Sequence, residues 1–138
     1  MAETVEFELV SPAKLLKSEP VEMVVVPGSE GDIGVLPNHS PLICTMRPGL
    51  IKVYENDKVS EEIFVAGGFC EVSPERCTVL AEEAILVTDL NRTEAEERLR
   101  RAKEMVESAT EHEIEEARKH LNLAEEMMAA VDYVEKGR

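Results

Sequence analysis

The chain has 138 residues, of which 43% are hydrophobic and 32% are charged, and its formal net charge is -14. This length and composition predict a soluble globular protein with one compact domain and an appendage. The acidic excess argues against nucleic acid and against an anionic membrane surface as partners, because both are bound through clustered Lys and Arg.

No segment has the pattern of a signal peptide or of a membrane span. The first four residues contain neither a basic region nor an apolar stretch. The longest apolar run, Met127–Val131, has five residues, whereas a membrane span requires roughly 20. We therefore expect a soluble protein that reaches a membrane only through a partner.

The first part of the chain predicts β-structure over residues 1–88. All seven prolines and six of the seven glycines lie there, and they separate short segments of near-alternating polarity. In the opening segment Val5, Phe7 and Leu9 point to one side and the glutamates between them to the other. Further strands are expected at residues 21–26, 42–47, 50–55, 63–66, 69–73, 78–81 and 85–87. Many short strands with regular turns predict an antiparallel β-sandwich or flattened barrel.

The long connection between the strands at 21–26 and 42–47 holds three glycines spaced three apart, at positions 28, 31 and 34. A phosphate-binding loop would lead into a helix and usually carry a lysine. Here Pro37 and Pro41 prevent a helix, and the loop carries Glu30 and Asp32 instead. On chemistry alone this segment is a rigid hairpin connection whose glycines permit unusual backbone angles.

Neither the histidines nor the cysteines predict a reactive centre. His39 and Ser40 lack an orienting acid and an oxyanion hole, and adjacent residues of an extended chain point apart, so a small enzyme built on them is disfavoured. Cys44, Cys70 and Cys77 are odd in number, form no CxxC pair and lie in apolar segments. They are expected to be buried small hydrophobes in a reducing compartment. We expect no metal and no cofactor.

The part of the chain after Asp89 predicts an antiparallel α-helical hairpin over residues 89–138. The segments 93–96 and 110–113 both have the capping-box form, in which Thr is followed three residues later by Glu. Each starts an apolar stripe with alternating steps of three and four, the pattern of two packed helices. The first stripe is Ala95, Leu99, Ala102, Val106 and Ala109; the second is Ile114, Ala117, Leu121, Ala124, Met128 and Val131. Because the seam is rich in alanine, the hairpin should be marginally stable by itself.

Several motifs, taken together, resemble the epsilon subunit of bacterial F-type ATP synthase. They are PGSEGDIGVLPNHSP at 27–41, PG at 48–49, VAGGF at 65–69, EV at 71–72 and TVLA at 78–81. The resemblance implies a β-sandwich followed by a helical hairpin. It also implies a non-catalytic subunit of the central stalk, the rotor, which couples proton flow to ATP synthesis and in many bacteria restrains ATP hydrolysis. Such a subunit is peripheral, on the cytoplasmic face of the bacterial inner membrane.

The resemblance further implies contact residues and partners. The c-ring contact would be made by Ser29, Glu30, Asp32 and Ile33. The gamma subunit would be contacted by His39, Ser40 and Leu42. The helical arm would reach the alpha/beta catalytic hexamer and meet the beta subunit with Arg98, Arg100, Arg101 and Lys103. The alternative for this basic cluster is a solvated helix face paired with neighbouring glutamates, and both interpretations stay open.

Some relatives of this kind bind ATP through a Leu/Ile-Asp-x-x-Arg-Ala motif, which is altered in this chain. The corresponding segment places Asn91 where the Asp would stand and Glu94 where the Arg would stand. A shift of two positions gives Asp89 and Arg92 but loses the flanking residues. A carboxylate against a phosphate is unfavourable, so no nucleotide site is expected.

A second functional hypothesis is a free-standing regulatory adaptor with a β-sandwich and a helical arm. Co-purification separates the two hypotheses. A rotor subunit brings down gamma, alpha and beta, whereas an adaptor does not.

Overall fold

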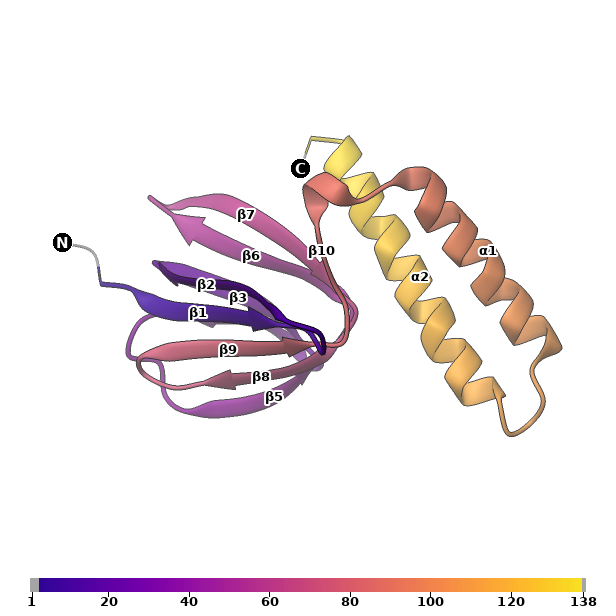
Figure 1. Cartoon of the computed structure of the whole chain (residues 1–138), viewed down its shortest axis with the longest axis horizontal. Helices are drawn as coiled ribbons and strands as arrows, with labels where there is room; N and C mark the ends of the chain where they lie inside the picture. Colours follow the sequence, from indigo (N-terminus) through magenta and orange to yellow (C-terminus); the bar gives the residue numbers. More distant parts are fainter. Residues whose placement is uncertain (1–2, 138) are drawn as a thin grey trace. The chain divides into compact units, whose positions relative to one another are not determined.

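The computed structural model describes residues 3–137 and divides into two compact units. The β unit ends at Ile85 and the helical unit begins at Leu86 (Figure 1). The strands are β1 Val5–Val10, β2 Leu15–Val21, β3 Met23–Gly28, β4 Gly31–Val35, β5 Leu42–Met46, β6 Gly49–Glu55, β7 Lys58–Val65, β8 Gly68–Val72, β9 Arg76–Ala81 and β10 Ala84–Leu86.

The strands of the β unit form one sheet in the order β10-β7-β6-β3-β5-β8-β9-β1-β2, with β4 paired to β3. The sheet curls into a half-barrel, so that β6 and β7 lie across from β1, β8 and β9 in Figure 1. The predicted fold, an antiparallel β-sandwich or flattened barrel, is thereby confirmed as a mostly antiparallel half-barrel. One pairing differs from the antiparallel expectation: β1 lies parallel to β9, which is far from it in sequence and therefore needs no hairpin between them.

The core fills the space inside the half-barrel. Val5, Phe7 and Leu9 are buried as their alternation predicts. Cys70 and Cys77 are also buried, with their Sγ atoms 3.7 Å apart. The hydrogen bond from Cys77, and next burial, raise the pKa of the Cys70 thiol above its ordinary value. A thiol that resists ionisation is a poor nucleophile, so these two cysteines act as small core residues.

Two strands were not predicted from the sequence, and both have a physical reason. β2 was missed because it contains Lys17, Glu19 and Pro20, which do not have the pattern of a strand. It is an edge strand of the sheet, where charged residues and proline are tolerated. β4 was taken as loop because two of its five residues are glycines. The expected long loop is in fact a β3–β4 hairpin followed by a shorter connection at residues 36–41.

The helical unit contains a short 3-10 helix, Val87–Asp89, and the helices α1, Arg92–Ser108, and α2, Ile114–Glu135. The two α-helices pack against each other, which confirms the predicted hairpin. Its alanine-rich seam is present, with Ala95, Ala102, Ala117 and Ala124 all buried.

The predicted N-cap of α1 is wrong. Asn91, not Thr93, caps the helix, and its Oδ1 accepts a hydrogen bond from the Glu94 backbone N–H at 3.0 Å. Asn91 has extended backbone angles and is among the best capping residues, so it starts the helix two residues before Thr93. The predicted N-cap of α2, Thr110, is also wrong, because the helix begins at Ile114 with Glu113 at its N-cap. Of the second capping box only one bond is present, in which Glu113 Oε1 accepts from the Thr110 backbone N–H at 2.9 Å. This bond lowers the pKa of Glu113.

A fragment of residues 1–87 retains the complete ten-stranded sheet, and we expect it to fold by itself. A domain of this size buries about 60–65% of the surface that its unfolded chain exposes. Heat should therefore unfold it in one cooperative transition, as measured by circular dichroism and calorimetry. A fragment that binds a hydrophobic dye and shows no cooperative unfolding transition would contradict this expectation.

Candidate functional site

The residues expected to contact the c ring gather at the tip, residues 28–33, where β3 turns into β4. Gly28 is required there, because a Cβ at this position would lie 2.6 Å from the Gly31 carbonyl oxygen. Gly31 has a φ of 140°, which side chains disfavour. The spaced glycines therefore serve a tight two-residue turn that presents Ser29 and Glu30.

The tip is braced from β5 and the residue that follows it. Arg47 donates from Nη1 to the Gly28 carbonyl oxygen and from Nη2 to Asp32 Oδ1, both at 2.6 Å. Ser29 donates its backbone N–H to the Thr45 carbonyl oxygen at 2.9 Å, and the two hydroxyls are hydrogen-bonded at 2.6 Å. Sequence reasoning missed Thr45 and Arg47, because only the folded chain brings them beside a turn that lies 15 or more residues earlier.

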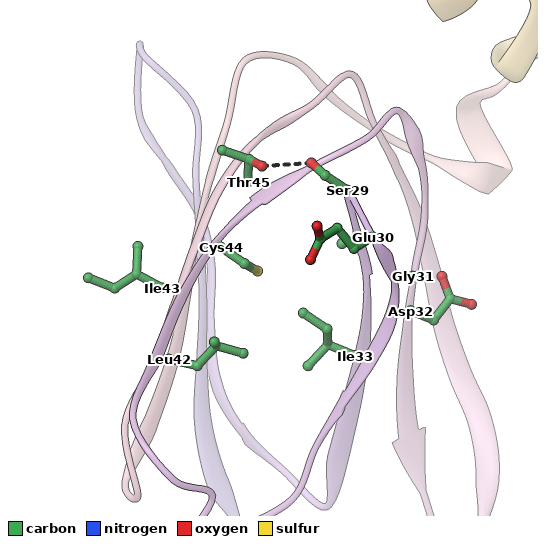
Figure 2. A pocket seen from close by; sticks show the side chains of 10 residues that line it. Ser29, Glu30, Gly31, Asp32, Ile33, Leu42, Ile43, Cys44 and Thr45 are labelled. Carbon is green, nitrogen blue, oxygen red and sulfur yellow. Dashed lines mark hydrogen bonds between the residues drawn. The ribbon is translucent and has the colours of Figure 1, made fainter.

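An open groove of about 580 Å³ lies beside the tip, between residues 28–33 on one side and residues 42–45 on the other. Ile33, Leu42 and Cys44 point into it, whereas Ile43 points away (Figure 2). Glu30 leans over the groove and Asp32 is directed outward. The structure thus brings Ser29, Glu30, Asp32 and Ile33 together around one groove, with the Asp32 carboxylate bound to Arg47.

The residues expected to contact gamma are split between two places. His39 and Ser40 lie in the connection after β4, where His39 Nδ1 donates to the Ser40 carbonyl oxygen at 2.7 Å. Leu42 lies on β5 and lines the groove at the tip. A nucleophile–base pair would require a bond from His39 to the Ser40 hydroxyl. The bond of His39 Nδ1 goes to the Ser40 backbone carbonyl instead.

A second exposed surface, not predicted from the sequence, runs across the outer face of the β unit. Phe69 is 56% exposed and Leu80 50% exposed, and they are partners across β8 and β9. The register continues from Leu80 to Val10 and from Val10 to Leu15, which is 57% exposed. We call these four residues the apolar row. The sequence signal for this surface is an apolar residue at a position where the alternation along the strand directs the side chain outward. Phe69 is an example, because the next residue, Cys70, points inward.

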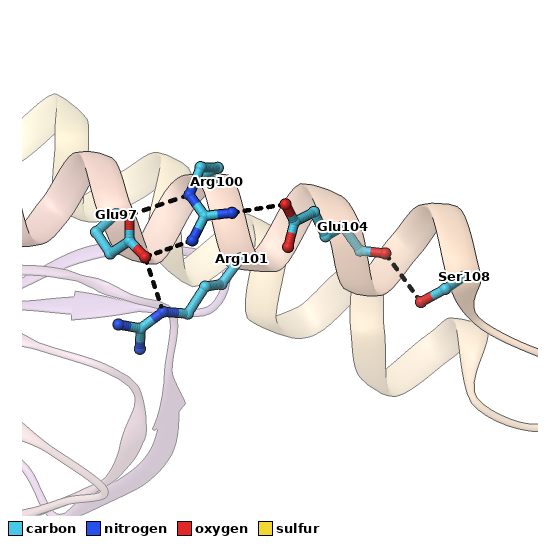
Figure 3. Close-up of polar contacts among 5 residues, drawn as sticks. All are labelled: Glu97, Arg100, Arg101, Glu104 and Ser108. Atoms are coloured by element: carbon cyan, nitrogen blue, oxygen red, sulfur yellow. Dashed lines mark hydrogen bonds and ion pairs between the residues drawn. The ribbon is translucent and has the colours of Figure 1, made fainter.

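The basic cluster of α1 is largely neutralised within its own helix. Arg100 pairs with Glu97 at 2.5 Å and with Glu104 at 2.6 Å, and Arg101 pairs with Glu97 at 3.2 Å (Figure 3). Hydrogen bonds from Arg100, and next from Arg101, lower the pKa of Glu97 to about 2. Lys103 is exposed and Arg98 is half-buried. In the folded hairpin, therefore, Arg100 and Arg101 lie on a solvated helix face and are paired with glutamates of the same helix.

Arg92 forms an ionic clasp between the two helices. At the start of α1, its Nε donates to Glu135 Oε1 at 2.9 Å and its Nη2 donates to Asp132 Oδ1. Both acids lie at the end of α2. The hydrogen bonds to Glu135 and Asp132 raise the pKa of Arg92. The arginine of the shifted nucleotide motif is therefore engaged by carboxylates of its own chain.

A braced, charged tip and an apolar outer row, carried by a β unit with a separate helical unit, define a docking subunit that acts by binding larger partners. Within residues 3–137, no helix is long and apolar enough to cross a membrane. In the same range, no group of three or more His, Cys, Asp or Glu is arranged to hold a metal ion.

Comparison with known proteins identifies which docking subunit this is. The family model of the ATP synthase Delta/Epsilon chain, β-sandwich domain, matches residues 4–87. The chain belongs to the ATP synthase epsilon chain family. The epsilon chain of Rhodospirillum rubrum is 53% identical over 131 residues, covering 94% of this chain and 98% of that relative. The epsilon chain of Paramagnetospirillum magneticum is 54% identical over 132 residues, covering 95% and 99%.

Solved structures share the fold. A chain of the Euglena gracilis mitochondrial ATP synthase, OSCP/F1/c-ring in rotational state 1, has a TM-score of 0.79 at 24% identity, covering 93% of this chain and 81% of that one. A chain of the Tetrahymena thermophila mitochondrial ATP synthase, central stalk/c-ring, has a TM-score of 0.62 at 15% identity, covering 92% and 96%. The predicted family is confirmed, and membership makes the chain a non-catalytic subunit of ATP synthase.

Because Arg100 is the main cause of the lowered pKa of Glu97, NMR titration of the Glu97 carboxyl should show a midpoint of about 2. The folded pKa lies below the ordinary value, so the pair stabilises α1 fully above pH 4.5 and loses this effect as the pH falls through 2. Arg100→Met should move the midpoint up towards 4.5. Lys103→Met is the control and should leave it in place; an unchanged midpoint in Arg100→Met would refute the pairing.

Proposed function

We propose that this epsilon subunit works in the central stalk of a bacterial F-type ATP synthase and couples proton flow to ATP synthesis. It is peripheral, on the cytoplasmic face of the inner membrane, and reaches the bilayer only through its partners. The observation that carries this proposal is the tip, which is exposed yet braced by Arg47 and Thr45. A surface that transmits torque must be rigid, because a flexible contact would yield under load.

The tip docks on the polar loops of the c ring. Its contact residues are Ser29, Glu30, Asp32 and Ile33, which lie within one turn and the first residues of β4. The acidic side chains suit a partner surface with basic and polar groups, because complementary charge steers docking and fixes register.

The gamma subunit docks on the outer face of the β unit. Its contact residues include His39 and Ser40, in the connection before β5, and Leu42, which lines the groove at the tip. On β5, Ile43 is 71% exposed and points outward (Figure 2), and it shares its face with Thr45, the cross-strand partner of Phe69. The contact therefore continues from Ile43 into the apolar row. Contiguous exposed apolar side chains of this kind indicate a protein interface.

The helical unit, residues 89–138, is a regulatory arm that contacts the alpha/beta catalytic hexamer when it extends. Arg98, Arg100, Arg101 and Lys103 then meet carboxylates of the beta subunit. In the folded arm Arg100 and Arg101 are paired with Glu97 and Glu104, so extension exchanges internal carboxylates for those of the partner. An exchange of similar contacts leaves the two states close in free energy, as a switch requires.

The direct test of this assignment is co-purification. An affinity tag on the chain, used in its source organism, should bring down gamma, alpha, beta and the c ring, identified by mass spectrometry. Recovery of the chain without these subunits would favour the free-standing adaptor.

Phe69→Glu should weaken gamma binding by about tenfold or more, because it places a charge in an apolar contact. The thermal midpoint of the isolated protein should change little, since Phe69 is 56% exposed. Val59→Glu is the matched control, because Val59 is also an exposed strand residue but lies outside the apolar row. Calorimetric titration with purified gamma measures both; equal affinities for the two variants would contradict the assigned face.

Removal of residues 90–138 should raise ATP hydrolysis by the assembled enzyme about fivefold or more and leave synthesis largely unchanged, because the arm can no longer resist rotation. Replacing Arg98, Arg100 and Arg101 with Ala should reproduce part of this rise, and added salt should mimic it, since exposed ion pairs are screened.

Arg92→Met provides the opposite test of the arm. Loss of the clasp should favour the extended arm and lower hydrolysis below that of the parent enzyme. If truncation leaves hydrolysis at the parent rate under all energisation states, the arm is not an inhibitor.

A further inference from the structure

We infer that Lys17 is a positioning residue for the Leu15 end of the apolar row. Its ion pair with Glu61 joins β2 to β7 and thereby fixes the edge strand that presents Leu15. This inference rests on the proposed docking of gamma on the apolar row and adds a residue that acts on this contact from the opposite face of the sheet.

The strand β2 is held by the sheet on one side only. In the strand order it lies at one edge with β1 as its neighbour, whereas β7 lies beside the other edge strand, β10. The other residues of the apolar row lie on strands with two neighbours each, Val10 on β1, Phe69 on β8 and Leu80 on β9. Leu15 is therefore the residue of the row whose position depends most on contacts other than backbone pairing.

Lys17 supplies such a contact. Its Nζ lies 2.6 Å from Glu61 Oε1 on β7 and 3.3 Å from Glu19 Oε1 on its own strand. The side chains of Lys17 and Glu61 are only 20% and 28% exposed, so water and salt screen this pair less than a surface pair. Burial lowers the pKa of Lys17, but the hydrogen bond to Glu61 and the charges of Glu61 and Glu19 outweigh burial and raise the pKa above its ordinary value. The ion pair thus attracts two strands that, within residues 3–137, the sheet does not pair.

The side chains of this pair point toward the inside of the half-barrel. Lys17 is the cross-strand partner of Leu9, and Glu61 is the cross-strand partner of Val53. Leu9 and Val53 are both buried in the core. Because cross-strand partners share a face of the sheet, Lys17 and Glu61 lie on the core side, opposite to the apolar row.

A β-bulge turns Leu15 to the outer face. The register shifts between Leu9 and Val10, so that Leu16 has no partner on β1. An extra residue of this kind re-aims the neighbouring side chains. Leu15 therefore pairs with Val10 and is exposed, although Lys17, two residues later, faces inward. Since Lys17 fixes the strand on one side of the bulge, loss of its ion pair should let Leu15 move.

The first test is hydrogen exchange of the isolated full chain, which needs no partner. Lys17→Met removes the charge, keeps an unbranched side chain and leaves Glu19 and Glu61 without their cation. Amide exchange in β2 should become about tenfold faster, while that in β8 and β9 stays at the parent rate. Lys58→Met is the matched control, because Lys58 is an exposed lysine of β7 itself, and it should change neither rate.

A double variant checks that the effect comes from the contact between the two strands. Lys17→Met combined with Glu61→Met should restore slow exchange in β2, because two apolar side chains can replace a half-buried ion pair without loss of stability. Exchange that stays fast in the double variant would show that Lys17 acts on β2 by some other contact, and the inference would be wrong.

The second test is calorimetric titration with purified gamma. Lys17→Met should weaken gamma binding about threefold, and Leu15→Ala should weaken it by a similar factor. The two changes together should weaken binding little more than either alone, because both act on the same contact. Lys17→Met combined with Phe69→Ala should instead be additive, because Phe69 lies on a strand that the sheet holds on both sides.

The outcomes separate this inference from the proposed function. Parent-like exchange of β2 in Lys17→Met, or equally faster exchange in every strand, would overturn the inference, since the pair would then be idle or a general stabiliser. Unchanged gamma affinity, or full additivity with Leu15→Ala, would refute the positioning role. If Phe69→Glu also binds gamma like the parent, the assigned gamma face is wrong and the inference falls with it. Glu61→Gln replaces Lys17→Met if the latter does not fold.

Discussion

The branching of β3 is the constraint on which the β unit and its exposed tip depend. The first part of this strand pairs with β6, its whole length beyond Met23 pairs with β4, and its last residue, Gly28, pairs with Met46 of β5. Val24 and Val26 point from it into the core and are fully buried. The strand that joins the two halves of the sheet therefore also ends at the tip. Core packing and the position of the tip are consequences of the same pairing.

This connection explains why so exposed a turn can be rigid. A two-residue turn has few contacts of its own, and exposed side chains contribute little to stability. Here the turn is held by backbone hydrogen bonds from Ser29 and Arg47 to Thr45 and Pro27 and by the guanidinium of Arg47. Thr45 belongs to β5 and Arg47 directly follows it, and β5 is itself held by five residue pairs with β8. Movement of the tip relative to the sheet would thus break the hydrogen bonds that join it to Thr45 and to Arg47.

Residues that are close in sequence were predictable, and contacts between distant segments were not. The alternation of Val5, Phe7 and Leu9 fixed the inner face of β1, and the alanine spacing fixed the helical seam, because each pattern follows from the period of a single element. The family resemblance located the tip but could not show that Asp32 is engaged by Arg47, since only the β3–β5 pairing brings them together. The strand β4 was missed because propensity disfavours glycine in strands, whereas its pairing with β3 overrides that preference.

The helical unit follows a different logic, because its two helices are joined by chain at one end only. Residues 109–113 connect α1 to α2, so separation must begin at the opposite end, where α1 starts and α2 finishes. Arg92 binds Asp132 and Glu135 at that open end. These bonds must break before the two helices can separate. Alanine side chains in the seam add little apolar area for each turn, so the balance between closed and open forms is sensitive to a few polar contacts. Those contacts are exposed and are weakened by salt. A larger apolar seam would hold the hairpin closed more firmly, whereas this small seam leaves its closure dependent on the ionic clasp.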